Sequence, residues 1–361
     1  MSMKKKVFVG MSGGVDSSVS ALLLKQAGYE VTGVFIKVWQ ADFLPCTWRD
    51  ERRDAMRVAA HLGIPFITLD LEREYKEEVV DYMIREYREG RVPNPDVMCN
   101  KYVKFGAFYT YARAHGADFI ATGHYATTKQ VDGHTYLAKS EDEEKDQTYF
   151  LWTLNEEILE HTFFPVGGMT KNDVREIATK YGLPNAEKKD SQGLCFIGKV
   201  DMRDFLKHYL NTTQGEVLDE AGNIIGTHEG AMLYTIGQRH GFTIENTKQD
   251  TKPYYVVSKH IEHNTITVSE TPHANDEFIA TGFSTNTLHA VHPQAYTNNS
   301  EIDIRIRYRG ELHPGTIAAS GTGGEVKFTT PTPQVTIGQS AVFYKNDLVL
   351  GGAVIDKVSH G

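Results

Sequence analysis

Apolar residues in the first 120 positions follow two alternating periodicities. The stretch ending just before Gly63 repeats apolar positions at i, i+3, i+4 and i+7, as helices do. A second helical pattern ends just before Gly28, and both glycines suit helix C-termini. Between the helical stretches lie short apolar runs, typical of buried parallel strands, at residues 7–9, 31–36, 66–71 and 119–122. This alternation predicts a doubly wound α/β domain, whose ligands bind at the carboxyl ends of the strands.

The pattern changes after about residue 205. Short alternating runs, separated by turn signals, occur at residues 254–257, 265–269, 302–308, 341–344 and 348–354. Residues 271–276 are typical of a linker. We therefore predict a nucleotide-binding catalytic domain over residues 1–205, a central β-rich domain over 206–275 and a β-barrel-like domain over 276–361.

A glycine-rich loop follows the first predicted strand. Residues 10–18 read Gly-Met-Ser-Gly-Gly-Val-Asp-Ser-Ser. Gly13 and Gly14 let backbone N–H groups approach an oxyanion, and the helix start adds a partial positive charge. Hydroxyl donors are expected from Ser12, Ser17 and Ser18. The loop matches neither the Walker A nor the Rossmann spacing. It predicts a phosphate site, and the alternative is a simple glycine turn entering a helix.

The stretch of residues 93–100 contains the first informative cysteine. Asn94 suits a helix N-cap and Pro95 the first helical position, which places Asp96 and Cys99 on one face of the helix. The helix start lowers a thiol pKa and a nearby carboxylate raises it, so the sequence leaves the balance open. Two interpretations follow: proton transfer by Asp96 with attack by Cys99, or a dipole partner beside a buried apolar cysteine.

A second cysteine, Cys195, lies between Gly193 and Gly198, and lysines at 188 and 189 favour its thiolate. The alternative, which this stretch taken alone favours, is a purely structural cysteine. Cys46 has no comparable context and receives no role. Three cysteines do not form a secreted disulfide framework, so we expect a cytoplasmic protein whose thiols are available for chemistry.

The net charge of −9 argues against nucleic-acid binding through a global field, so any RNA partner needs local basic patches. Strand alternation over residues 304–309 predicts that Arg305, Arg307 and Arg309 share one face suited to phosphates. Simple solvation of that face is the alternative. No apolar run reaches membrane-spanning length, so no membrane partner is expected.

Several motifs together resemble the tRNA-uridine 2-sulfurtransferases, the bacterial 2-thiouridylases of the PP-loop ATP pyrophosphatase superfamily. The resemblance covers essentially all 361 residues and is carried by residues 10–19, 90–101, 121–125, 145–151, 190–198, 235–239 and 338–344. The glycine-rich loop marks only the superfamily, whereas the two cysteine motifs together mark the family.

The resemblance implies an activity and its partners. ATP adenylates the 2-carbonyl oxygen of uridine at tRNA wobble position 34, and persulfide sulfur then replaces it, with release of AMP and pyrophosphate. ATP with Mg²⁺, a tRNA, a persulfide donor or relay protein and a monomeric enzyme are therefore expected.

Residue roles follow from the same resemblance. Cys195 receives the sulfur as a persulfide, Asp96 assists proton transfer, and Cys99 attacks, leaving a Cys99–Cys195 disulfide. Whether hydrosulfide or the persulfide sulfur attacks the base stays open. Residues 190–198 are expected to adopt two arrangements. The nucleotide contacts implied are Gly10, Met11, Ser12, Gly13, Gly14, Val15, Asp16, Ser17, Ile36 and Gly123.

The implied tRNA contacts fall in two groups. Asn94, Pro95 and Asp96 border the flipped target base. Further contacts are His124, Lys145, Asp146, Gln147, Arg307, Tyr308 and Gln339.

Three other functions would each explain only part of the sequence. Another ATP pyrophosphatase leaves Asp96, Cys99 and Cys195 without roles. A thiol–disulfide oxidoreductase would give the glycine-rich loop no function, and this chain lacks the Cys-x-x-Cys motif typical of that class. A non-catalytic tRNA adapter would not need intact cysteines and an intact loop.

Overall fold

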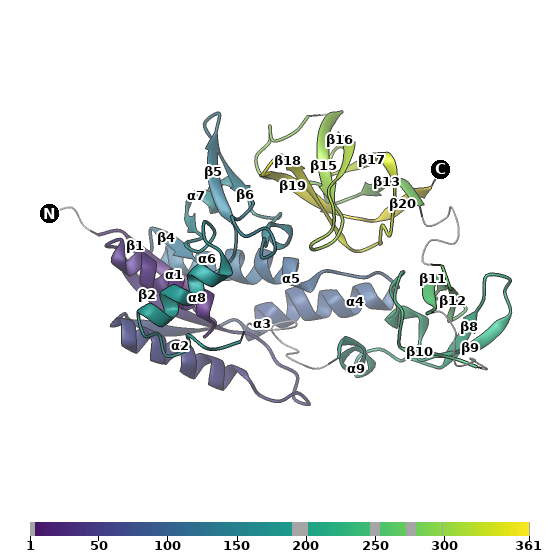
Figure 1. Cartoon of the computed structure of the whole chain (residues 1–361), viewed down its shortest axis with the longest axis horizontal. Coiled ribbons are helices and arrows are strands. Elements are labelled where there is room, and N and C mark those ends of the chain that lie inside the picture. The colour runs from purple at the N-terminus through teal and green to yellow at the C-terminus, as the bar shows by residue number, and fades with distance from the viewer. Residues whose placement is uncertain (1–3, 190–200, 246–252, 272–278, 298, 361) are drawn as a thin grey trace.

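The computed structural model describes residues 4–189, 201–245, 253–271, 279–297 and 299–360. Figure 1 shows an α/β portion that carries the N-terminus and two strand-rich portions formed by later parts of the chain. Among the described residues, none of the helices is both long and apolar enough to cross a membrane.

The α/β portion is built on a five-stranded sheet of order β3-β2-β1-β4-β7, in which every neighbouring pair is parallel. Its strands are β1 (Lys6–Gly10), β2 (Glu30–Lys37), β3 (Phe66–Asp70), β4 (Phe119–Ala121) and β7 (Thr162–Phe163). The first four lie where the apolar runs predicted them, although the edge strand β3 has no fully buried residue.

Helices cover both faces of this sheet, as the predicted doubly wound fold requires. One core packs Val7 and Val9 against α1 (Val15–Gln26), α2 (Trp48–Leu62) and α8 (Lys171–Lys180). The opposite core contains Ile120 and side chains of two long helical stretches. The first stretch comprises α3 (Glu72–Tyr75), η1 (Lys76–Asp81) and α4 (Tyr82–Arg88), and the second comprises α5 (Pro95–Met98), η2 (Cys99–Ala107) and α6 (Phe108–Ala114).

The segments η1 and η2 are π-helical. At the end of η2 the backbone N–H of Phe108 donates to the carbonyl of Val103, five residues earlier. A π turn is wider than an α turn and rotates the following residues relative to α-helical spacing. Such turns are common at functional sites.

The second half of the chain forms two further sheets. One has the order β10-β9-β8-β12-β11. Its strands are β8 (Gly215–Leu218), β9 (Ile224–His228), β10 (Phe242–Ile244), β11 (Tyr255–His260) and β12 (Thr265–Ser269). The remaining described helices are short: η3 (Thr148–Phe150), α7 (Glu156–Glu160), α9 (Met202–Lys207) and η4 (Ala231–Leu233).

The other sheet, here called the C-terminal sheet, has the order β20-β13-β17-β16-β15-β18-β19-β6-β5, with β14 paired to β19. Its late strands are β13 (Ile279–Thr285), β14 (His289–Ala290), β15 (Ser300–Arg305), β16 (His313–Ser320), β17 (Gly323–Pro333), β18 (Ser340–Lys345), β19 (Leu348–Val354) and β20 (Lys357–His360). Two strands come from much earlier in the chain, β5 (Thr127–Val131) and β6 (His134–Ala138). Because β6 pairs with β19, backbone hydrogen bonds attach the C-terminal sheet to the segment that follows β4.

One predicted strand is shorter than expected, and the prediction that it places Arg305, Arg307 and Arg309 on one face is wrong. β15 ends at Arg305, whose guanidinium turns inward to the buried carboxylate of Asp146 at 3.0 Å. The next residue, Ile306, is buried, and the carbonyl of Arg307 then accepts from the N–H of Gly310 in a turn. Arg309 takes a positive φ of 58°. The inward ion pair and the turn end the alternation.

Arg305 is therefore expected to act on stability. Removing one partner of a buried ion pair leaves the other charge uncompensated, so Arg305→Ala should lower the free energy of unfolding by about 3–5 kcal/mol. The side chains of Arg305 and Asp146 are 15 % and 4 % exposed. Arg307→Ala, at an exposed position, should change stability by only about 0.5 kcal/mol. Urea unfolding of both variants tests this, and equal stability would contradict the assignment.

Candidate active site

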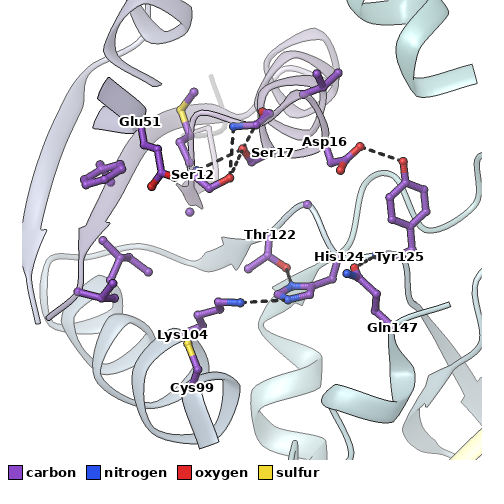
Figure 2. A pocket seen from close by; sticks show the side chains of 18 of the residues that line it. Ser12, Asp16, Ser17, Glu51, Cys99, Lys104, Thr122, His124, Tyr125 and Gln147 are labelled. Carbon is purple, nitrogen blue, oxygen red and sulfur yellow. Dashed lines mark hydrogen bonds between the residues drawn. The ribbon is translucent and has the colours of Figure 1, made fainter. Parts of the chain in front are cut away.

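A cavity of about 670 Å³ opens at the carboxyl ends of the parallel strands. The segment from the end of β1 to the first turn of α1, called here the phosphate loop (residues 10–17), lines one side, and Cys99 with Lys104 lines another (Figure 2). Ile36 at the end of β2 and Gly123 after β4 complete the wall. Strand ends meet at this edge of a doubly wound sheet, so residues far apart in the sequence share one crevice.

The phosphate loop is held in shape by its own hydroxyl groups. The hydroxyl of Ser17 donates to the carbonyl of Gly14 at 3.1 Å, and the N–H of Ser12 donates to Ser17 at 3.3 Å. All of residues 10–17 except Gly13 line the cavity. Ser18 is fully buried and donates to Gly14 at 2.9 Å. The expectation that Ser18 offers its hydroxyl to phosphate is therefore wrong.

Gly13 is needed for close packing rather than for contact with the cavity. Its φ is +79°, and a Cβ there would lie 2.4 Å from the carbonyl oxygen of Glu51 in α2. Asn185 supports the same loop, because its amide donates to the carbonyl of Gly13 at 2.9 Å and to the hydroxyl of Ser18 at 3.0 Å. Sequence reasoning missed Asn185, since no motif connects it with a loop some 170 residues earlier.

Asp16 is the acidic residue of the phosphate loop. Its carboxylate accepts from the hydroxyl of Tyr125 at 2.9 Å and pairs with the ammonium of Lys171 at 2.6 Å. Tyr125 and Lys171 also line the cavity, and neither was selected from the sequence. Lys171 adds positive charge beside the loop, as an anion site requires.

Gly123 brings the end of β4 against the start of α1. A Cβ at this position would lie 2.5 Å from the backbone nitrogen of Ser17 and 2.8 Å from the carbonyl carbon of Asp16. Only a glycine allows this approach. The phosphate loop and the His124–Tyr125 segment consequently face one cavity.

His124 lies inside the cavity wall, between two polar partners (Figure 2). Its Nδ1 is 2.8 Å from the hydroxyl of Thr122, and its Nε2 is 3.5 Å from the ammonium of Lys104. Burial, together with the Lys104 charge, holds the pKa of His124 well below its usual value. His124 is therefore a neutral imidazole near pH 7.

The cysteine helix begins as the sequence predicts. Asn94 is the N-cap, accepting from the N–H of Val97 at 3.4 Å, and Pro95 occupies the first helical position. Cys99 is 3 % exposed and lines the cavity. Burial raises the pKa of the Asp96 carboxyl, and the charge of Lys104 partly offsets this. Cys195 lies outside the described residues, as does the segment expected to adopt two arrangements.

Lys104 is a cavity residue that sequence reasoning did not find. It follows Cys99 by five residues, a spacing that places two side chains about 140° apart around an α-helix. In the π-helical η2 both residues line the cavity. The sequence carries no clear signal for a π turn, so this pairing required the structure.

The residues expected to contact tRNA occupy different places. Lys145, Gln147 and Tyr308 line the cavity, together with Arg309. Gln147 is oriented by the N–H of Tyr125, which donates to its Oε1 at 2.9 Å. Tyr308 packs on Phe150 with ring centroids 4.6 Å apart.

Three others make contacts within the protein. Asp146 is 4 % exposed and accepts from the Thr148 hydroxyl as well as from Arg305. Arg307 is exposed and bonds the Gln334 side chain. Gln339 donates to two main-chain carbonyls near Asn94.

Three family models match successive parts of the chain. Residues 5–199 match the family model of the tRNA methyl transferase HUP domain, residues 203–270 that of the tRNA methyl transferase PRC-barrel domain, and residues 280–355 that of the aminomethyltransferase beta-barrel domain. The chain is 45% identical over 358 residues to tRNA-specific 2-thiouridylase MnmA 1 of Geobacillus kaustophilus, covering 98% of this chain and 96% of that protein. The chain belongs to the tRNA-specific 2-thiouridylase family.

A second member of this family, tRNA-specific 2-thiouridylase MnmA of Listeria welshimeri, is 44% identical over 360 residues, covering 98% of this chain and 95% of that protein. Among solved structures, a 4-thiouridine synthetase–RNA complex with bound ATP covers 56% of this chain and 50% of its own, with 20% identity and a TM-score of 0.37. Family membership confirms the resemblance given by the sequence motifs, and the matched domains agree with the predicted fold class.

Gly123→Ala tests the close approach of β4 to the phosphate loop. The added Cβ must push the backbone at Asp16 and Ser17 away, because it would lie less than 3 Å from both. This displacement of the phosphate loop should weaken ATP binding by roughly tenfold or more. Gly168→Ala is the control, since a Cβ there meets nothing within 4 Å. Isothermal titration of both variants with a non-hydrolysable ATP analogue provides the measurement. Equal affinities would refute the packing argument.

Proposed function

We propose that the chain catalyses ATP-dependent 2-thiolation of uridine at the wobble position 34 of tRNA. The supporting observation is that one cavity holds the phosphate loop and Cys99 on facing walls, with Asp96 on the same helix as Cys99. An oxygen activated by a nucleotide and the sulfur that replaces it would thus meet in one crevice. Its relatives are named for this tRNA chemistry.

In the first step the 2-carbonyl oxygen of the base attacks the α-phosphate of ATP, the α–β phosphoanhydride bond breaks, and pyrophosphate leaves. Residues of the phosphate loop that line the cavity, together with the start of α1, would bind the phosphates. Ile36 provides an apolar wall for the adenosine, and Asn94 with Pro95 borders the base. An anticodon-loop base is unpaired, so inserting it into the cavity costs little.

Mg²⁺ would accompany ATP. This ion usually needs only one or two protein carboxylates besides phosphate oxygens and water. Asp16 and Glu51 both line the cavity, so the residues present fit that requirement. The described residues contain no group of three or more His, Cys, Asp or Glu side chains that could hold a metal alone. When bound, Mg²⁺ neutralises charge on the phosphates.

Sulfur transfer follows. A persulfide donor passes its outer sulfur to Cys195, and the donor leaves as a thiol. The Cys99 thiolate then attacks the Cys195 sulfur, so that the persulfide S–S bond breaks, hydrosulfide leaves and a Cys99–Cys195 disulfide forms. Hydrosulfide adds to C2 of the base and AMP departs with the former carbonyl oxygen. In the alternative order, the outer sulfur attacks C2 before Cys99 attacks Cys195. A dithiol reductant supplies two electrons to restore both thiols.

Asp96 is the proton acceptor for the Cys99 thiol. The raised pKa of its carboxyl brings it closer to that of a thiol, which makes proton transfer less unfavourable. Lys104 keeps a positive charge nearby when Cys99 becomes an anion.

We further propose that the tRNA is contacted by four residues that line the cavity, namely Lys145, Gln147, Tyr308 and Arg309. His124 and Asp146 support these residues from inside the protein. Arg307 adds an exposed contact to phosphate. The enzyme is proposed to act as a cytoplasmic monomer that accepts sulfur from a donor protein.

The products of ATP use test the first step. Incubation with unmodified tRNA, ATP and a persulfide donor should release AMP and pyrophosphate in a one-to-one ratio with 2-thiouridine. Nucleoside mass spectrometry and ion-exchange chromatography of the nucleotides provide the two measurements. Release of ADP and phosphate, with no thiolated nucleoside, would reject the proposal.

The two cysteines should stop the reaction at different points. Cys195→Ser should bind tRNA and ATP but accept no sulfur, whereas Cys99→Ser should accumulate a Cys195 persulfide that is not discharged. Non-reducing peptide mapping after a single turnover should find the Cys99–Cys195 bridge only when tRNA and ATP are present. Cys46→Ser is the matched control, because this exposed cysteine has no assigned role. Normal thiolation by Cys99→Ser would show that the mechanism is wrong.

A further inference from the structure

Residues 91–93, called here the base-binding turn, lie between α4 and α5 and lead directly into Asn94, Pro95 and Asp96. The location of this turn fixes where the cysteine helix starts. Its contacts come largely from the C-terminal sheet, more than 240 residues later in the chain.

The loop before β18 binds the main chain of the turn. The N–H of Val92 donates to the carbonyl of Ile337 at 3.0 Å. The side-chain amide of Gln339 donates to the carbonyls of Val92 at 2.8 Å and Pro93 at 3.3 Å. Gln339 thus directs its amide nitrogen into the protein, toward the turn.

Gly338 allows this contact. Its φ is +91°, and a Cβ would lie 2.8 Å from the nitrogen and 3.0 Å from the carbonyl carbon and oxygen of Val92. All three atoms belong to the backbone, so no side-chain movement could relieve the collision. The two main chains touch here because residue 338 has no side chain.

An ion-pair bridge closes the other end of the turn. Arg91 pairs with Glu86 of α4 at 2.6 Å and with Asp356, which follows β19, at 2.7 Å. The three side chains are only 14–20 % exposed. Asp356 also accepts from the N–H of Asn286 at 2.7 Å, so the bridge reaches a second loop of the C-terminal sheet.

We propose that Gly338 and Gln339 are positioning residues of the thiolation reaction: they hold the base-binding turn, and through it Asn94 and Asp96, in place beside Cys99. This inference rests on the proposed function and assigns Gln339 a role through Val92 and Pro93 instead of through direct contact with tRNA. The C-terminal sheet thereby becomes part of the active-site framework. A turn held this way keeps the acceptor base aligned with the reacting groups, and misalignment is costly in rate.

Gln339→Ala and Gly338→Ala test the proposal. Both should lower kcat for 2-thiouridine formation by roughly tenfold or more and leave the tRNA Kd within about twofold, because alignment is lost while the RNA contacts stay. Hydrogen–deuterium exchange of the peptide covering residues 89–98 should become faster in both variants. The exchange measurement needs neither tRNA nor activity. If wild-type enzyme makes no 2-thiouridine, the proposed function fails. The exchange result still decides whether Gly338 and Gln339 hold the base-binding turn in place.

Matched controls separate positioning from other effects. Gln294→Ala removes an exposed glutamine, and Gly321→Ala adds a side chain at φ +61° with nothing within 4 Å. Both should keep wild-type kcat and exchange. If Gly338→Ala does not fold, Gln339→Ala carries the test alone. A large rise in tRNA Kd with unchanged exchange would show that Gln339 contacts tRNA directly. Unchanged kcat and unchanged exchange would show that Gln339 does not hold the base-binding turn. Either result overturns the proposal.

Discussion

The close approach of Gly123 to the start of α1 is the constraint on which the site depends. Two backbone segments meet there at a separation that a single Cβ would prevent. On one side the contact sets the phosphate loop, and on the other it sets His124 and Tyr125, which reach Lys104 and Asp16. The cavity is therefore defined by main-chain packing, and its polar side chains take their directions from that packing.

Cationic side chains outnumber carboxylates along the cavity, and two of them lie against polar partners. Lys171 lies against Asp16, and Lys104 lies between His124 and the helix that carries Asp96 and Cys99. A neutral His124 can accept from Lys104 without adding a second positive charge, since its pKa is low. Positive charge is thus concentrated where phosphate and anionic sulfur would be, although the whole chain carries a net charge of −9.

The C-terminal sheet is joined firmly to the part of the molecule that carries the cavity. It is attached to the α/β portion because its strands β5 and β6 follow β4 in the chain and β6 pairs with β19. The buried Arg305–Asp146 ion pair and the contact of Gly338 with Val92 add two further attachments. Backbone hydrogen bonds, a buried charge pair and close main-chain packing are each sensitive to small displacements. Such a combination favours one fixed arrangement of the sheet beside the cavity.

The sequence by itself determined the elements whose signals are local. Apolar periodicity located β1 to β4, Gly63 ended α2, and Asn94 with Pro95 began the cysteine helix, because burial, left-handed backbone and capping depend on neighbouring residues. Tertiary structure alone decided the rest. The π turn that brings Lys104 to the cavity has no clear sequence signature, and Arg305 turns inward only because Asp146 is buried opposite it. Asn185 and Gln339 act on backbone atoms far away in the chain, and such contacts leave no periodicity or motif, since any backbone carbonyl offers the same acceptor.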